Sequence, residues 1–150
     1  MIALLQRVSY ASVTVADQTI AQIESGLLAF IGIEHADKQA EADRLLGKIL
    51  GYRIFEDADG KMNNALTDIK GGLLLVPQFT LVADTQKGMR PSFSSAASPE
   101  MASALFETFC QRAVNQYPQV AIGQFGAKMQ VSLVNDGPVT FWLHVKPTKA

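Results

Sequence analysis

The sequence contains very little cysteine and no long hydrophobic segment. Cys110 is the only cysteine among the 150 residues, so no internal disulfide framework can form, which suits a reducing cytoplasm. No apolar run approaches the ~18 residues of a membrane-spanning helix, and no basic stretch precedes the first apolar residues. We therefore expect a cytoplasmic protein without a membrane partner, whose first residues form a strand and not a signal peptide.

Charge of either sign is also scarce. Charged residues make up 18% of the chain and the formal net charge is -1, so composition gives no general sign of a nucleic-acid-binding protein. Any nucleic acid would have to be held locally, by a few cations and by pockets. An apolar fraction of 48% over 150 residues is enough for a real core, and we expect one domain over residues 1–150.

The familiar catalytic and metal-binding patterns are missing. His35 and His144 do not lie in a metal-ligand spacing with a second histidine or with cysteine, so we expect no metal and no cofactor. There is no nucleophile elbow, P-loop or dinucleotide-binding glycine pattern. Cys110 lies among apolar residues at helical spacing and is expected to be a core thiol. If the chain is an enzyme, its catalysis is expected to rest on positioning and backbone electrostatics, with the substrate supplying the reacting group.

Strand patterns dominate the first part of the chain. Residues 1–33 alternate between apolar and polar, with a turn at 16–18, and end in a continuous apolar run typical of a strand buried on both faces. A short strand is predicted at 53–55, followed by a turn at 57–60. A second fully buried strand is predicted at 73–76.

Two segments have the apolar spacing of helices. The first is predicted to run from a cap at Asp37 to about Leu50, with Gly51 as its stop. The second begins after Ser98, where an N-cap residue, a proline and an acidic residue follow one another. Its buried stripe is expected to comprise Met101, Leu105, Phe106, Phe109, Cys110, Ala113 and Val114.

The segment from Val131 to Leu143 has alternating apolar residues on both sides of Asn135-Asp136-Gly137-Pro138. Asp-Gly between two such runs is a hairpin signal, and the Gly-Pro bond is the best candidate for a cis peptide in the chain. Glycine leaves backbone exposed, so the loop can present carbonyl oxygens without side chains in the way. The simpler interpretation is a tight turn, with the proline as the first residue of the next strand.

Polar residues follow the buried strand at 73–76. Gln78 and Thr80 flank Phe79 at the strand end, where open sheets place ligand groups, although satisfied edge polar groups are the alternative. The next segment, 82–98, has no periodicity and carries cations, an aromatic residue and hydroxyls. These suit a phosphate and a stacked base, or a solvated surface loop. Arg7, after an apolar strand, has either a solvated or a site role.

Two motifs together resemble the D-aminoacyl-tRNA deacylase family. They are Gln78-Phe79-Thr80-Leu81 at a strand end and Asn135-Asp136-Gly137-Pro138-Val139-Thr140 in the last part of the chain. Further matching segments occur in the family's order: Arg7-Val8, Ala11-Ser12-Val13, Gly51-Tyr52-Arg53-Ile54-Phe55, Gly60-Lys61-Met62-Asn63, Gly88-Met89-Arg90-Pro91-Ser92-Phe93 and Met129-Gln130-Val131. The resemblance therefore covers nearly the whole chain.

The resemblance implies an enzyme that hydrolyses the ester bond between a D-amino acid, or glycine, and the terminal adenosine of tRNA. The implied glycine substrate is tRNA-Ala that has been wrongly charged with glycine. The family has a β-barrel-like α+β fold with a mixed sheet and two main helices, and it forms homodimers. The implied partners are aminoacyl-tRNA and a second subunit, with no DNA, membrane or cofactor.

The resemblance also assigns roles to particular residues. Gly137 and Pro138, joined by a cis bond, would reach into the pocket of the other subunit and act as a chiral filter. Arg7 would hold that loop in orientation. Gln78, Phe79 and Thr80 would line the ester site, mostly through backbone donors, and Met129 would also bind the substrate. Thr80 would be either the nucleophile or a bystander to assistance by the terminal ribose 2′-hydroxyl, and the missing base favours the second.

One position departs from the family pattern. Pro77 stands where the family usually has serine before Gln-Phe-Thr-Leu, which removes a hydroxyl and one backbone N–H. Two other interpretations therefore stay open: a module that binds aminoacyl-tRNA or D-amino acids without turnover, and an esterase that depends on Thr80.

Overall fold

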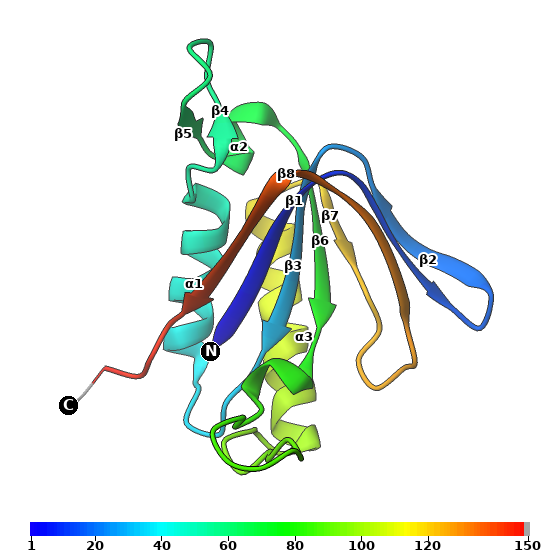
Figure 1. Ribbon diagram of the computed structural model, residues 1–150, viewed down its shortest axis with the longest axis vertical. Coiled ribbons are helices and arrows are strands. Elements are labelled where there is room, and N and C mark those ends of the chain that lie inside the picture. The colour runs from blue at the N-terminus through cyan, green and yellow to red at the C-terminus, as the bar shows by residue number, and fades with distance from the viewer. Residues whose placement is uncertain (149–150) are drawn as a thin grey trace.

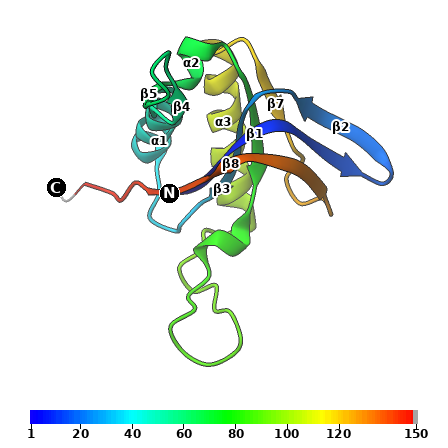
Figure 2. The ribbon, with the colours of Figure 1, turned by 45° about the horizontal axis from the view of Figure 1, so that its top comes forward.

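A long strand, β1 (Ile2–Val15), is the centre of the sheet in the computed structural model, which describes residues 1–148 (Figure 1). β8 (Gln130–His144) pairs with it antiparallel along almost its whole length. On its other side, β1 pairs first with β3 (Gly26–Gly32) and then with β2 (Gln18–Ile23), both antiparallel. Because the first half of β1 pairs with β3 and its second half with β2, the sheet bends around β1 and has the predicted barrel-like form (Figure 2).

Parallel strands extend the sheet beyond β3. β6 (Gly72–Pro77) pairs with β3, and β7 (Val120–Ile122) pairs with β6, which gives the order β2-β1-β3-β6-β7. The two continuous apolar runs lie in β3 and β6 and are buried, as predicted. The two strands approach closely where they begin, because a Cβ atom on Gly26 would overlap the backbone of Gly72.

Two main helices cover one face of the sheet. They are α1 (Gln39–Gly51), which follows β3, and α3 (Pro99–Gln116), which leads to β7 (Figures 1 and 2). The hydroxyl oxygen of Ser98 accepts a hydrogen bond from the backbone N–H of Met101 at 3.2 Å, so the predicted N-cap is confirmed. A third helix, α2 (Leu66–Ile69), is a single turn.

The predicted buried stripe of α3 is correct for Phe106, Phe109, Cys110 and Ala113, but Met101 and Leu105 are only partly buried, and the buried Ala102 was not predicted. Its buried residues are Ala102, Phe106, Phe109, Cys110 and Ala113. Val114 is 50% exposed, because a helix turns by about 100° per residue and position 114 lies on the flank of the stripe. Together α1, α3 and the sheet enclose the larger apolar cluster, and the bend of β1, β2 and β8 encloses a smaller one.

The short strand predicted at 53–55 begins later than expected. A two-stranded ladder joins β4 (Phe55–Glu56) to β5 (Met62–Asn64), with the predicted turn at 57–60 between them. Ile54 precedes this ladder because its carbonyl oxygen accepts a hydrogen bond from the side chain of Arg7.

The predicted hairpin near the end of the chain is wrong. β8 continues through this segment as one strand, and both halves pair with β1, with Asn135 opposite Val8 and Thr140 opposite Gln6. β1 is long enough to bind both halves, so they lie end to end and not side by side. Residues 136–139, here called the Gly-Pro loop, lie opposite Arg7 alone and bulge out of the ladder.

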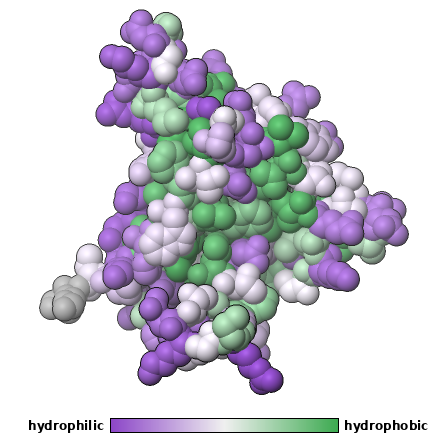
Figure 3. Space-filling model, in the orientation of Figure 1, coloured by the Kyte–Doolittle hydropathy of each residue, from purple (hydrophilic) through white to green (hydrophobic). Residues whose placement is uncertain are grey.

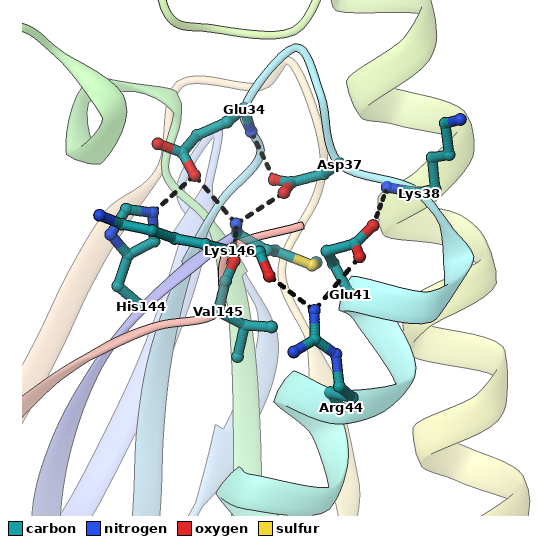
Figure 4. A network of polar contacts seen from close by, with 9 residues as sticks. Glu34, Asp37, Lys38, Glu41, Arg44, His144, Val145 and Lys146 are labelled. Atoms are coloured by element: carbon teal, nitrogen blue, oxygen red, sulfur yellow. Dashed lines mark hydrogen bonds and ion pairs between the residues drawn. The ribbon is translucent and has the colours of Figure 1, made fainter. Parts of the chain in front are cut away.

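A network of charged groups joins the start of β1 to the end of β8 (Figure 4). The buried α-amino group of Met1 donates to the carboxylates of Asp37 at 2.7 Å and Glu34 at 3.0 Å, and to the carbonyl oxygen of Val145 at 2.7 Å. His144 lies 2.8 Å from Glu34. Burial alone would raise the pKa of Glu34, but hydrogen bonds and positive charge from the amine and His144 lower that pKa below its ordinary value.

The network corrects the predicted start of the first helix. Asp37 is not the N-cap of α1, because its carboxylate faces the buried amine of Met1 and the backbone N–H of Glu34. The N-cap is Lys38, whose backbone N–H donates to Glu41 at 2.8 Å. Among residues 1–148, we find no helix with the length and apolar character needed to cross a membrane.

Candidate active site

The polar segment after β6 continues the sheet for one residue and then turns. The backbone N–H of Gln78 donates to the carbonyl oxygen of Ile31 in β3 at 2.8 Å. A 3-10 helix, η1 (Phe79–Val82), follows, in which the N–H of Leu81 donates to the carbonyl oxygen of Gln78 at 3.2 Å, so the N–H groups of Phe79 and Thr80 precede its first internal bond. β7 pairs only with Leu73, Leu74 and Leu75 of β6, so the N–H that Pro77 lacks breaks no bond of this ladder.

Three predicted site residues, Gln78, Phe79 and Met129, line one cavity of about 440 Å³ beside this strand end. Its wall is mostly apolar and is completed by Val76, Pro77, Ala96, Ala97, Pro99, Ala102, Phe125, Gly126, Ala127 and Val131. Phe79 is 63% exposed and its ring lies 5.2 Å from that of Phe93. The mouth of the cavity therefore has an exposed aromatic surface next to the segment between η1 and α3, which extends away from the sheet (Figure 2).

Thr80 lies beside this cavity and is exposed. Its hydroxyl oxygen accepts a hydrogen bond from the side-chain amide of Gln78. Within residues 1–148, no histidine or carboxylate bonds to the Thr80 hydroxyl, so no protein base is placed to activate it. Burial raises the pKa of Cys110 to about 12, and this residue is a core thiol, as predicted.

Arg7 holds the Gly-Pro loop from β1. Its side chain is mostly buried; Nε donates to the carbonyl oxygen of Asp136 at 2.9 Å, and Nη1 donates to the carbonyl oxygen of Ile54 at 2.9 Å. The peptide bond between Gly137 and Pro138 is cis, as predicted, and both residues are exposed.

Two features of the loop were not identified from the sequence. The side-chain amide of Asn135 bonds to the backbone of Arg7 and Val139 across the base of the loop. A Cβ atom on Gly137 would overlap the backbone nitrogen of Val139 and lie 2.6 Å from its Cγ2. Asn-Asp-Gly occurs in many turns, so its presence in the sequence does not indicate a specific role for the Asn135 side chain.

The structure does not bring all predicted site residues together within one chain. The Gly-Pro loop borders a separate recess of about 320 Å³, which is lined by Arg7, Val8, Ser25, Phe55, Glu56, Ile69 and Asp136. This recess shares no lining residue with the cavity beside Gln78. Among residues 1–148, no group of three or more histidine, cysteine or acidic side chains is arranged to hold a metal ion.

Known proteins resemble this chain over nearly its whole length. The family model described as D-Tyr-tRNA(Tyr) deacylase matches residues 4–144. A D-aminoacyl-tRNA deacylase of Herminiimonas arsenicoxydans is 61% identical over 147 residues, which cover 98% of this chain and 99% of that protein. A D-aminoacyl-tRNA deacylase of Thioalkalivibrio sulfidiphilus is 58% identical over 149 residues, which cover 99% of this chain and all of that protein.

Two solved structures have the same fold. One, titled c-Myc DNA Unwinding Element Binding Protein, has a TM-score of 0.93 and 38% identity, and the match covers 99% of this chain and 100% of that one. Another, a probable eukaryotic D-amino acid tRNA deacylase, has a TM-score of 0.81 and 18% identity over 95% of this chain and 97% of that one. The predicted fold and family are therefore confirmed, and the chain belongs to the D-Tyr-tRNA(Tyr) deacylase family.

Proposed function

We propose that this chain hydrolyses the ester bond of D-aminoacyl-tRNA and releases the D-amino acid and free tRNA. Membership of the deacylase family makes it a carboxylic ester hydrolase. The observation that carries the substrate assignment is the Gly-Pro loop, an exposed backbone surface with no space for a side chain at position 137. The reaction takes place in the cytoplasm and needs neither metal nor cofactor.

The Gly-Pro loop acts as a chiral filter. Backbone carbonyls of Gly137 and Pro138 face the α-carbon of the substrate and clash with an L side chain, while a D side chain points away from them. A filter of this kind selects by the chirality of the α-carbon and does not depend on the chemistry of the side chain. Glycine has no Cβ and passes the filter, so glycyl-tRNA mischarged on tRNA-Ala is also a substrate.

A homodimer completes the active site. Within one chain the loop lies away from the cavity beside Gln78, so the filter reaches a cavity only when it comes from a second copy. In the described part of the chain, β8 has β1 as its only strand partner, and it carries Val134 and Trp142, which are 57% and 56% exposed. Apolar side chains gather over the middle of the face shown in Figure 3. Such a surface suits a two-fold interface between identical chains.

Catalysis depends on the cavity and on the substrate. The N–H groups of Phe79 and Thr80, at the start of η1, are suited to stabilising the negative charge that develops on the carbonyl oxygen of the ester. The Thr80 hydroxyl lacks a base, so the 2′-hydroxyl of the terminal ribose assists the reaction in place of a protein nucleophile. A tRNA ending in 2′-deoxyadenosine is expected to be hydrolysed at least about 100-fold more slowly, whereas an esterase that depends on Thr80 would show no such loss.

The test is hydrolysis of matched D- and L-aminoacyl-tRNA by the purified protein with a chelator present. Release of the D-amino acid alone supports the proposal, and equal rates on both enantiomers contradict the filter. Binding of D-aminoacyl-tRNA with no release of amino acid would instead identify a binding module. Excess duplex DNA is expected not to inhibit, because the proposed contacts are with the aminoacylated end of the tRNA, which a DNA duplex lacks.

A further inference from the structure

The side chain of Asn135 closes the base of the Gly-Pro loop. Its Oδ1 accepts a hydrogen bond from the backbone N–H of Val139 at 3.1 Å, and its Nδ2 donates to the carbonyl oxygen of Val139 at 2.9 Å. The second hydrogen of Nδ2 donates to the carbonyl oxygen of Arg7 at 2.9 Å. One primary amide therefore bonds to the residue that ends the loop and to the strand opposite it.

These contacts fix the orientation of the amide. The N–H of Val139 can only donate, and the carbonyl oxygens of Val139 and Arg7 can only accept, so Oδ1 and Nδ2 cannot exchange places. The amide replaces the strand partner that Val139 lacks where the loop interrupts the ladder. Aspartate has no donor for the two carbonyl oxygens, and alanine has neither donor nor acceptor.

Arg7 contacts the start of the loop through two different atoms. Its carbonyl oxygen accepts from Asn135, while its guanidinium donates to the carbonyl oxygen of Asp136. Gly137 and Pro138 have no side chain that can form a hydrogen bond, so the orientation of their carbonyl groups is set by contacts at the two ends of the loop.

We propose that Asn135 is a positioning residue for the chiral filter, and that its amide sets the direction of the Gly137 and Pro138 carbonyls. This inference rests on the proposed function. It separates two roles within the loop: the glycine and proline face the substrate, and Asn135 acts through them. Loss of the amide lets the loop move. The variant should therefore lose discrimination between enantiomers, while ester cleavage in the cavity is affected less.

The test is the ratio of kcat/KM for D-aminoacyl-tRNA to that for L-aminoacyl-tRNA. In Asn135→Asp and Asn135→Ala, this ratio is expected to fall by about 100-fold, since displacement of a positioned group by about 1 Å has an effect of that size. Asn115→Asp is the matched control, because Asn115 is an exposed residue on α3. Thermal unfolding and backbone hydrogen exchange over residues 131–143 are measured on the same samples.

A reduced ratio in folded Asn135 variants, with faster exchange at Val139 and no change in Asn115→Asp, supports the proposal. An unchanged ratio in either folded variant overturns it. Failure of both variants to fold also overturns it, because Asn135 would then serve the fold and not the filter. If the wild-type protein does not release D-amino acids, it is the proposed function that fails, and the hydrogen-exchange comparison still shows whether Asn135 holds the loop.

Discussion

The cavity beside Gln78 and the Gly-Pro loop form in different ways. The cavity lies where a buried parallel strand ends, and its wall comes from the end of β6, the start of α3 and the segment before β8. The loop is an interruption of a long antiparallel ladder, and Arg7 and Asn135 hold its two ends. The cavity is made of side chains, and the loop presents backbone.

This difference explains how the proposed enzyme combines broad tolerance with strict selection. An apolar cavity can accommodate many ligand shapes, since few polar groups constrain what enters it. A backbone surface with fixed orientation rejects one hand of substrate whatever its side chain. Changes to the loop should therefore alter the choice between enantiomers, and changes near Thr80 should alter rates on both enantiomers alike.

The largest effect is expected from Gly137→Ala. The new Cβ would overlap the backbone of Val139, so the loop must move, and the ratio of D to L hydrolysis is expected to fall by at least about 100-fold. Rapid-quench measurement with matched aminoacyl-tRNAs gives this ratio. Gly47→Ala is the control, because a Cβ atom there meets nothing within 4 Å. An unchanged ratio in Gly137→Ala would remove the loop from the selection step.

A smaller effect is expected from Arg7→Lys. A lysine cannot donate to the carbonyl oxygens of Asp136 and Ile54 in the geometry of the guanidinium, so the ratio is expected to fall by about tenfold and the free energy of unfolding by about 1–3 kcal/mol. Urea unfolding and deacylation are both measured. Arg112→Lys changes an exposed ion pair with Asp43 and should leave both quantities nearly unchanged.

Thr80→Ala is expected to change the rate on D-aminoacyl-tRNA by less than about tenfold and to leave the ratio of enantiomers unaltered. The hydroxyl has Gln78 as its partner and no base, so its loss removes a hydrogen bond and not a nucleophile. Single-turnover rates distinguish the alternatives. A loss of more than about 1,000-fold would establish a nucleophilic role and exclude substrate assistance as the main mechanism.

Asp37→Ala is expected to leave enantiomer choice unchanged and to lower the free energy of unfolding by about 3 kcal/mol. It removes the nearer of the two carboxylates that face a buried amine and leaves Glu34 as the other, and removal of one partner of a buried ion pair has a cost of that size. The comparison is with Asp43→Ala, whose exposed ion pair contributes about 1 kcal/mol or less. A selectivity change in Asp37→Ala would show that the network and the loop are coupled.

The same network predicts a dependence of stability on pH. The pKa of Glu34 is lowered on folding, so its contribution is fully present above its ordinary pKa of 4.5 and is lost as pH falls through the folded value. The free energy of unfolding should therefore decline below about pH 4.5, and less steeply in Glu34→Gln. Equal slopes for the two proteins in urea titrations across pH 3–6 would contradict this.

The sequence predicted buried elements well and the neighbours of the final strand poorly. Continuous apolar runs identified β3 and β6, and the sequence at Ser98 identified the start of α3, because these signals are local. The hairpin prediction failed because Asp-Gly is a local turn signal, whereas the pairing of β8 depends on the length of β1. The role of Asp37 was missed for a similar reason: its partner is Met1, far away in sequence.

The candidate site also contains parts that could be predicted from the sequence and parts that could not. The resemblance identified Gln78, Phe79 and Met129, which do line one cavity, and Arg7, which does contact the Gly-Pro loop. The wall provided by Ala96 and Ala97 could not be predicted, because small apolar residues in an aperiodic segment carry no signal. The role of the Asn135 amide could not be predicted, because asparagine is equally common in ordinary turns and the sequence does not distinguish the two cases.

The central claim is that the loop of one subunit serves the cavity of the other, and mixing of variants tests it most directly. One variant, Gly137→Ala, has an altered loop; another, Phe79→Asp, has an altered cavity. After refolding together in equal amounts, half of the dimers are mixed, and in each of them the unaltered cavity receives the unaltered loop, so hydrolysis of L-aminoacyl-tRNA is expected to fall to about a quarter of the rate of Gly137→Ala alone, per subunit. A fall to only about a half, which simple dilution by an inactive Phe79→Asp would give, would contradict the account.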